Sequence, residues 1–148
     1  MPVNTSQDSE PVSVRHVAVY GTLRKGQRND INLLRPPVAF VGLAQLFGRL
    51  YDLDLYPGLV LDDDAGHVVC EVYAVSPEVE AAMDELEATY PAQPDEYAKR
   101  ERTLEVSTAQ GLRKMRCFFY EMNPAYVQGK PVIASGDWVV AAASGKRP

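Results

Sequence analysis

The residues best suited to chemistry lie in a short loop that follows an apolar run near the start of the chain. Val17–Tyr20 is β-branched, small and aromatic, which is typical of a buried strand. Gly21 and Gly26 follow it and permit sharp backbone turns that other residues resist. Between the two glycines, the residues Thr22–Lys25 can present backbone N–H groups and a hydroxyl at the end of the strand. Such a concavity of donors suits an anion, either a carboxylate or a phosphate.

The two glycines of this loop also have the spacing of a phosphate-binding P-loop. That motif requires a lysine and then a serine or threonine directly after the second glycine. Gln27 and Arg28 occupy those positions, which disfavours a nucleotide site. A phosphate or nucleotide binder built on Gly21 and Gly26 stays as a minor alternative, and so does a turn that merely ends a strand.

One helix is predicted after the middle of the chain. Ser76 suits the N-cap and Pro77 the first helical position, and Tyr90-Pro91 ends the helix. Apolar residues recur at helical spacing and form the expected inward stripe: Val79, Ala82, Met83 and Leu86.

Two acidic residues of this helix, Glu80 and Glu87, lie on the flank of the apolar stripe. A carboxylate in that position can be partly desolvated, which raises its pKa and makes it a better general base near neutral pH. The helical wheel does not separate the two. The alternative for both is a solvated surface carboxylate, because Glu is rarely buried.

The rest of the chain favours strands. The expected strands are Val14–Tyr20, Val38–Leu53 (one or two strands, with bends or bulges at Gly42 and Gly48), Val68–Val75, Tyr97–Val106 and Leu112–Glu121. Asn29–Leu34 can form a helical turn, Tyr56–Gly58 a tight turn and Asp62–Gly66 a solvated hairpin loop. The segment after Glu121, through Trp138 and Val140, is expected to be extended or irregular.

Composition predicts one globular domain. The 148 residues favour a single unit over residues 12–143, between tails at 1–11 and 144–148. The net charge of −5 disfavours a nucleic-acid or anionic-membrane surface. No apolar run approaches the roughly 18 residues of a membrane span, and the first residues carry no export signal. A cytoplasmic protein with neither nucleic-acid nor membrane partners is expected.

The cysteines and histidines do not form a metal-binding pattern. Cys70 and Cys117 each lie inside an apolar run and are expected to be buried hydrophobic residues in a reducing compartment. His16 and His67 are far apart and have no neighbouring ligand pattern. We therefore expect no metal site.

The segment Tyr20–Asn29, YGTLRKGQRN, resembles the signature loop of the γ-glutamyl cyclotransferase-like superfamily, and most closely that of its γ-glutamylamine cyclotransferase branch. Four further segments, which together with the loop cover about residues 15–140, follow in the order of that family: Gly48–Val60, Met83–Pro91, the Tyr97-x-x-Arg100 pair and Ser135–Trp138. The resemblance implies an α+β fold, in which one main helix packs against a small, mostly antiparallel, barrel-like sheet.

The resemblance also implies a set of site residues. The family's catalytic glutamate corresponds to Glu87, with Met83 where leucine is more usual. The residues implied to bind substrate are Tyr20, Gly21, Thr22, Leu23, Asn29, Tyr97, Arg100 and Tyr120. The basic residues Arg24, Lys25 and Arg28 are expected to be solvated at the rim, because basic side chains rarely lose their water.

The activity implied by the resemblance is the release of 5-oxoproline and a free amine from a γ-glutamyl-amine, without metal or other cofactor. The α-amine of the substrate attacks the carbonyl of its own side chain, and Glu87 acts as the base. The leaving amine and the oligomeric state are left open. The alternative is a non-catalytic member of the same fold that binds a small acidic ligand or a protein.

Overall fold

The fold is taken from a computed structural model that describes residues 14–89 and 96–143, without the side chains of residues 87–89. The predicted tails at 1–11 and 144–148, and the predicted helix end at Tyr90-Pro91, lie outside the described residues. Ten elements follow one another along the described chain.

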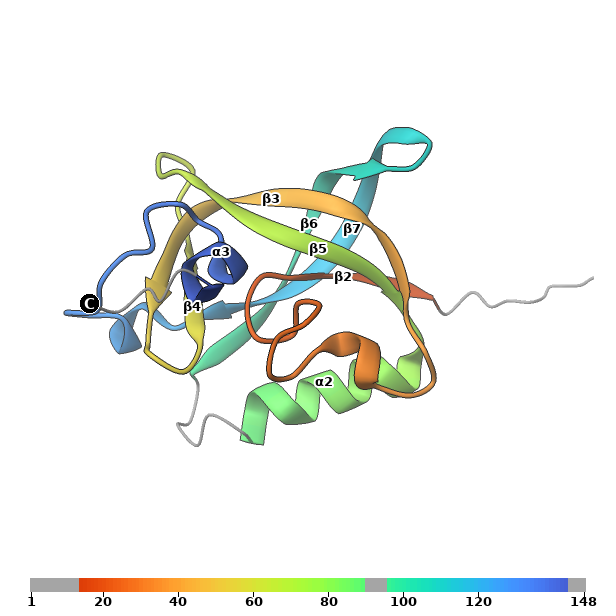
Figure 1. Cartoon of the computed structure of the whole chain (residues 1–148), viewed down its shortest axis with the longest axis horizontal. Coiled ribbons are helices and arrows are strands. Elements are labelled where there is room, and N and C mark those ends of the chain that lie inside the picture. The colour runs from red at the N-terminus through yellow and green to blue at the C-terminus, as the bar shows by residue number, and fades with distance from the viewer. Residues whose placement is uncertain (1–13, 90–95, 144–148) are drawn as a thin grey trace, which may run out of the picture.

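Five strands close into a barrel (Figure 1). The strand order is β4-β3-β5-β2-β7-β6, and β3 pairs a second time with β6, which closes the ring. The pairing of β2 with β7 is parallel and the others are antiparallel, so the predicted barrel-like, mostly antiparallel sheet is confirmed. The strands are β2 (Arg15–Val19), β3 (Ala39–Asp52), β4 (Pro57–Leu61), β5 (His67–Val75), β6 (Tyr97–Thr108) and β7 (Gly111–Met122).

Strand β3 closes the barrel at a glycine. It is one long strand with a bulge between Phe40 and Gly42, and Gly42 pairs with Val72 of β5 on one side and with Thr108 of β6 on the other. A Cβ atom on Gly42 would lie 2.1 Å from the carbonyl oxygen of Ser107. The absence of a side chain at this bulge therefore lets β6 approach β3 closely enough to pair.

Strand β4 corrects two predictions. Tyr56–Gly58 is not a turn: β4 begins at Pro57, and the turn lies one step earlier, where the N–H of Leu53 donates to the carbonyl of Tyr56 (3.0 Å). Asp62–Gly66 does not join paired strands either, because β4 and β5 lie on opposite sides of β3. This loop crosses β3 instead. Loop signals mark where a strand ends, but not which strand becomes its neighbour.

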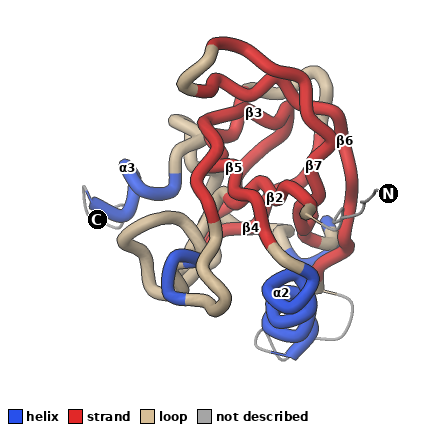
Figure 2. Tube along the Cα trace, turned by 90° about the vertical axis from the view of Figure 1, so that its right-hand side faces the viewer, coloured by secondary structure: helices blue, strands red, loops and turns tan. Residues whose placement is uncertain are grey.

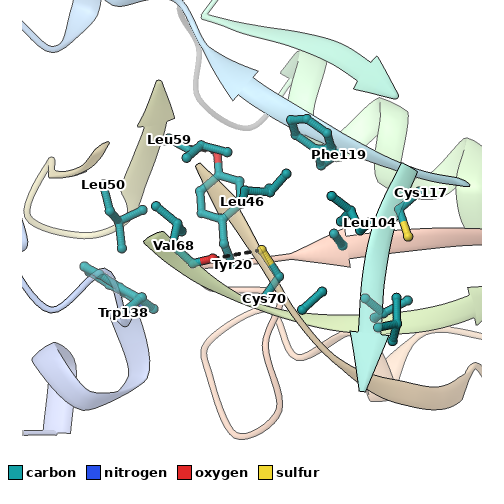
Figure 3. Close-up of a cluster of buried hydrophobic side chains, with 14 of the residues drawn as sticks. Tyr20, Leu46, Leu50, Leu59, Val68, Cys70, Leu104, Cys117, Phe119 and Trp138 are labelled. Carbon is teal, nitrogen blue, oxygen red and sulfur yellow. Dashed lines mark hydrogen bonds between the residues drawn. The ribbon is translucent and has the colours of Figure 1, made fainter. Parts of the chain in front are cut away.

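Two hydrophobic clusters form the core. One fills the barrel and contains Ala18, Tyr20 and both cysteines (Figure 3). The other lies between the barrel and the main helix, and it contains Val17 and Val19. Alternate residues of β2 thus serve the two clusters. Both cysteines are fully buried as predicted, and burial raises the pKa of the Cys70 thiol to about 12 and that of Cys117 to about 11.

The main helix α2 (Pro77–Thr89) begins as predicted, with the Ser76 hydroxyl accepting the N–H of Val79 (3.2 Å). It lies below the barrel in two perpendicular views (Figures 1 and 2). Val79 and Met83 are fully buried and Leu86 is half-buried, but Ala82 is exposed, which corrects the predicted stripe. A straight helix contacts a curved barrel along a narrow line, so the flank of its apolar stripe stays in water.

A second helix, α3 (Trp138–Ala143), replaces the extended segment that the sequence predicts. Val139 and Val140 favour a strand locally because they are β-branched. Asp137 stabilises the helix start instead, since its carboxylate accepts the N–H of Val140 (3.2 Å), while buried Trp138 packs in the barrel core. Short 3₁₀ turns complete the fold: Ile31–Leu33, inside the segment predicted as a helical turn, and Pro124–Tyr126. No helix among the described residues has the length and hydropathy of a membrane span.

Candidate functional site

A cavity lies where the loop after β2 meets β4, β6, β7 and the end of α2. Seven of the eight residues predicted to bind substrate line it: Tyr20, Gly21, Thr22, Leu23, Asn29, Tyr97 and Tyr120. Tyr56, Pro57 and Leu86 line it too, although none of the three is among the eight residues predicted to bind substrate. The lining thus brings together segments that are far apart in the sequence.

The loop is held in shape by its own hydrogen bonds. The N–H of Arg24 donates to the carbonyl of Gly21 (3.0 Å), and that of Asn29 donates to the carbonyl of Thr22 (2.9 Å). The side-chain amide of Asn29 also donates to the Thr22 hydroxyl (3.2 Å). A Cβ atom on Gly21 would lie 2.7 Å from the ring of Pro57, so glycine is what allows the loop to pack against β4.

Arg24 is not a rim charge, contrary to the sequence prediction. Only 7% of the residue is exposed. Its Nε lies 2.9 Å from Glu71 Oε2 on β5, and its Nη1 lies 2.8 Å from Asp137 Oδ1. Glu71 Oε1 accepts two further hydrogen bonds, from the N–H of Lys25 (2.9 Å) and from the Tyr73 hydroxyl (2.8 Å). A buried ionic network therefore fixes the loop to the barrel and to the start of α3.

Three tyrosine hydroxyls of the cavity hold neighbouring segments together. Tyr20 donates to the carbonyl oxygen of Tyr120 (2.6 Å) and accepts the N–H of Leu59 (3.3 Å). Tyr97 donates to the carbonyl of Pro57 (3.2 Å). Tyr56 donates to a carboxylate oxygen of buried Glu96 (2.6 Å). These bonds fasten β4 to β6 and β7, and so they fix the width of the cavity.

The fourth tyrosine, Tyr120, bonds to the main helix. Its hydroxyl lies 2.6 Å from Asp84 Oδ1. Lys99 of β6 contacts the same carboxylate, with its Nζ 3.0 Å from Oδ1 and 3.1 Å from Oδ2. Asp84 therefore joins α2 to the two strands that form this side of the cavity.

Arg100 lies away from the cavity, unlike the other predicted residues. Its Nε donates to Glu121 Oε1 (2.9 Å), and Glu121 Oε2 accepts the N–H of Leu61 (2.9 Å). Successive side chains of a strand point to opposite faces, so Arg100 and Tyr97, three residues apart, face different sides. Arg100 stabilises the contact of β4 with β7 and is not part of the candidate site.

Glu87 lies in the last turn of α2, and its side chain is outside the described residues. Its backbone directly follows that of Leu86, which lines the cavity. Glu80, the other base left open by the sequence, is engaged elsewhere: Arg15 lies 3.0 Å from its Oε2, and Lys99 contacts the same oxygen. Burial alone would raise the pKa of Glu80, but these two partners lower it below its ordinary value, which makes Glu80 a weaker base.

Among residues 14–89 and 96–143, no three His, Cys, Asp or Glu side chains gather in a way that could hold a metal ion. The chemical resources of the described cavity are instead a loop of backbone amides, a wall of tyrosines and the end of a helix. This arrangement can hold a small anionic molecule between the loop and the helix.

Comparison with known proteins identifies the family to which such a site belongs. The model of the family described as gamma-glutamyl cyclotransferase, AIG2-like, matches residues 17–140. The chain belongs to this family. The family match spans every residue of the cavity lining, including the loop after β2 and the end of α2.

Individual relatives agree with this assignment. A protein of Halalkalibacterium halodurans, named "Putative gamma-glutamylcyclotransferase BH1612", is 32% identical over 96 residues, which cover 64% of this chain and 80% of that protein. An uncharacterized protein of Pyrococcus horikoshii has a crystal structure with a TM-score of 0.64 and 29% identity, over 89% of this chain and 96% of that chain. An AIG2-like protein of Mus musculus shares the fold at a TM-score of 0.66 and 23% identity, over 82% of this chain and 86% of that chain.

Proposed function

We propose that this member of the gamma-glutamyl cyclotransferase, AIG2-like family releases 5-oxoproline and a free amine from a γ-glutamyl-amine. The observation that carries the proposal is the convergence of the loop after β2, Tyr97, Tyr120 and the end of α2 on one cavity. The relative from Halalkalibacterium halodurans is named for the same class of activity, which supports the reaction type. In this proposal the cavity holds both ends of the glutamyl group.

The reaction is an intramolecular acyl transfer. The α-amine nitrogen of the substrate attacks the γ-carbonyl carbon, a C–N bond forms to close the five-membered lactam, and the C–N bond to the leaving amine breaks. Because nucleophile and electrophile belong to one molecule, holding the substrate in its folded conformation contributes much of the acceleration. The cavity therefore acts first as a template.

Glu87 carries the proton transfers in this proposal. An α-ammonium group cannot attack until it loses a proton, and the Glu87 carboxylate accepts it. The Glu87 carboxyl group returns this proton to the leaving nitrogen, which can then depart as the amine. The attacking nitrogen loses a second proton as the lactam forms, and the departing amine takes it up to become an ammonium group, so two protons leave the α-nitrogen and two reach the leaving nitrogen. General acid–base catalysis of this kind contributes about 10²–10⁴-fold to a rate.

The loop after β2 stabilises the negative charges of the reaction. In this proposal the backbone N–H groups of Gly21–Leu23 bind either the α-carboxylate or the oxyanion that develops on the γ-carbonyl oxygen. Preorganised donors of this kind are effective because they need no reorganisation as charge develops. The Arg24 network supports this role, since it fixes the loop on both sides.

The test is 5-oxoproline release from a panel of γ-glutamyl amines and γ-glutamyl dipeptides. We expect product from the wild type and from Glu85→Gln, which alters an exposed carboxylate of the same helix. Glu87→Gln should lose about 10²-fold or more in rate while it unfolds at the same denaturant concentration. Equal rates for wild type and Glu87→Gln would exclude Glu87 as the base. Binding of 5-oxoproline without turnover of any substrate would favour a binding protein.

A further inference from the structure

Tyr120 and Asp84 form a hydrogen-bonded side-chain pair at the cavity, and the chemistry of the carboxylate decides which of the two is the donor. Tyr120 lines the cavity near the end of β7, and Asp84 lies on α2 two residues before Leu86, another lining residue. The hydroxyl oxygen of Tyr120 lies 2.6 Å from Asp84 Oδ1. Carboxylate oxygens only accept hydrogen bonds, so the tyrosine is the donor. A distance of 2.6 Å is typical of a hydroxyl bound to an ionised acceptor.

Lys99 forms an ion pair with the carboxylate of Asp84. Its ammonium group bridges both oxygens of Asp84, at 3.0 and 3.1 Å, and lies 4.6 Å from the centre of the Phe118 ring. Burial alone would lower the pKa of Lys99, but Glu80 and Asp84 together raise it above its ordinary value. Lys99 is therefore cationic at neutral pH and holds the Asp84 carboxylate in position beside Tyr120.

We propose that Asp84 is a positioning residue that makes Tyr120 a hydrogen-bond acceptor for the α-amine of a γ-glutamyl substrate. This inference rests on the proposed function. Because the Tyr120 hydroxyl donates its hydrogen bond to Asp84, its oxygen can offer a ligand only a lone pair, as a hydrogen-bond acceptor. The matching group on a γ-glutamyl substrate is the α-amine, which carries N–H donors both before and after it loses a proton. The carbonyl oxygen of the substrate, an acceptor, is not a match.

The position of Asp84 on α2 adds a second consequence. Asp84 precedes Glu87 by three residues, so the two lie on neighbouring parts of one helix face. The bond between Asp84 and Tyr120 therefore fixes the rotation of the last turns of α2 against β7. A substrate amine bound by Tyr120 is thereby placed beside the last turns of α2, the part of the helix that contains Glu87.

The experiment compares two probes that differ only in the α-amine: γ-glutamylmethylamide and its des-amino counterpart, N-methylglutaramate. Their dissociation constants are measured by calorimetry in the Glu87→Gln protein, so that the first probe is not consumed. We expect Tyr120→Phe to weaken γ-glutamylmethylamide about tenfold or more, and to leave N-methylglutaramate unchanged. Asp84→Ala should show the same selective loss.

Two further variants separate positioning from structure. Asp84→Asn keeps an acceptor oxygen for the Tyr120 hydroxyl and should restore most of the affinity lost in Asp84→Ala. Glu85→Gln, a neighbouring and exposed carboxylate, should change neither dissociation constant. A general loosening of the fold would weaken both probes alike, which this pattern excludes.

Equal weakening of the two probes by Tyr120→Phe would overturn the inference. So would tighter binding of both probes by Asp84→Ala, because it would show that the released hydroxyl acts as a donor to the carbonyl group. Wild-type 5-oxoproline release is measured in parallel. An active wild type without the selective loss overturns this inference alone, whereas a wild type that neither binds nor consumes γ-glutamylmethylamide overturns the proposed function as well.

Discussion

The two sides of the cavity are fastened in different ways. The loop wall, residues 21–29, is held by Arg24, whose side chain is 8% exposed and lies between Glu71 and Asp137. The tyrosine wall, Tyr97 and Tyr120, is held partly by Asp84 and Lys99, whose side chains are 45% and 31% exposed. Both walls are held by ion pairs, but those of the loop wall are largely buried and those of the tyrosine wall are partly exposed to solvent.

This difference in burial predicts which of the two walls contributes to folding and which mainly affects ligand binding. A buried ion pair that loses one member leaves a charge without compensation, and the penalty is large. A pair near the surface is screened by water, and its removal has little effect on unfolding. We therefore expect changes in the loop wall to affect folding, and changes behind the tyrosine wall to affect ligand binding with folding nearly intact.

The largest effect is expected from Arg24→Met. The substitution leaves the buried Glu71 and the partly buried Asp137 without their cation, and the free energy of unfolding should fall by about 3–5 kcal/mol. Arg49→Met is the control, because the pair of Arg49 with Asp62 is half-exposed (50% and 34%) and should contribute about 0–1 kcal/mol. Urea unfolding measures both. A loss below about 1 kcal/mol in Arg24→Met would contradict the importance of the buried network.

Gly21→Ala tests the contact of the loop wall with β4. The added methyl group would lie 2.7 and 2.9 Å from two ring carbons of Pro57, which cannot rotate away. We expect a loss of about 1–3 kcal/mol, typical of overpacking, together with weaker binding at the displaced loop. Gly66→Ala is the matched control, since nothing lies within 4 Å of its Cβ position. Unchanged stability in Gly21→Ala would show that the loop and β4 move apart freely.

Lys99→Met should affect the tyrosine wall without unfolding the protein. The methionine keeps an apolar stem against Phe118 but removes the charge beside Asp84 and Glu80. Unfolding free energy should fall by less than about 1 kcal/mol, while KM for a γ-glutamyl-amine rises. Thermal unfolding and steady-state kinetics on the same preparation check the two effects. A loss comparable to that of Arg24→Met would remove the distinction between the walls.

The smallest effect is a dependence of stability on acid pH. The folded-state pKa of Glu80 is lowered below its ordinary value of 4.5 by Arg15 and Lys99, although burial opposes this. The unfolded state therefore binds the proton first, so the contribution of Glu80 is present above pH 4.5 and is lost as the pH falls through the lowered value. Glu80→Gln should flatten this part of the stability curve by a few tenths of a kcal/mol. An identical slope in both proteins would show that Glu80 gains nothing from its partners.

The sequence predicted the loop wall better than the ion pairs that hold this wall in place. Val17–Tyr20 and the two glycines indicate a strand and a loop because the signal is local. The burial of Arg24 depends on Glu71 and Asp137, which are 47 and 113 residues away. A general tendency of arginine to stay solvated cannot include partners that only the closed barrel brings together.

The sequence predicted only part of the tyrosine wall, because its contacts also join residues that are far apart in the chain. A helical wheel places Asp84 toward water, and half of its side chain is indeed exposed. Its decisive partner, Tyr120, lies 36 residues away on β7. The Pro-Gly neighbours of Tyr56 predict a turn, whereas Tyr56 directly precedes β4 and lines the cavity. Tyr20 and Tyr120 were found through family resemblance rather than pattern.

The most direct test of the central claim is to run the reaction in H₂¹⁸O with γ-glutamylmethylamide labelled with ¹⁵N at the α-amine. Intramolecular attack predicts 5-oxoproline that retains the ¹⁵N and contains no ¹⁸O, with one equivalent of unlabelled methylamine. Mass spectrometry of the products reads both isotopes at once. Glutamate that carries ¹⁸O in its side-chain carboxylate would show that water, and not the α-amine, is the nucleophile, and it would contradict cyclotransferase chemistry at this cavity.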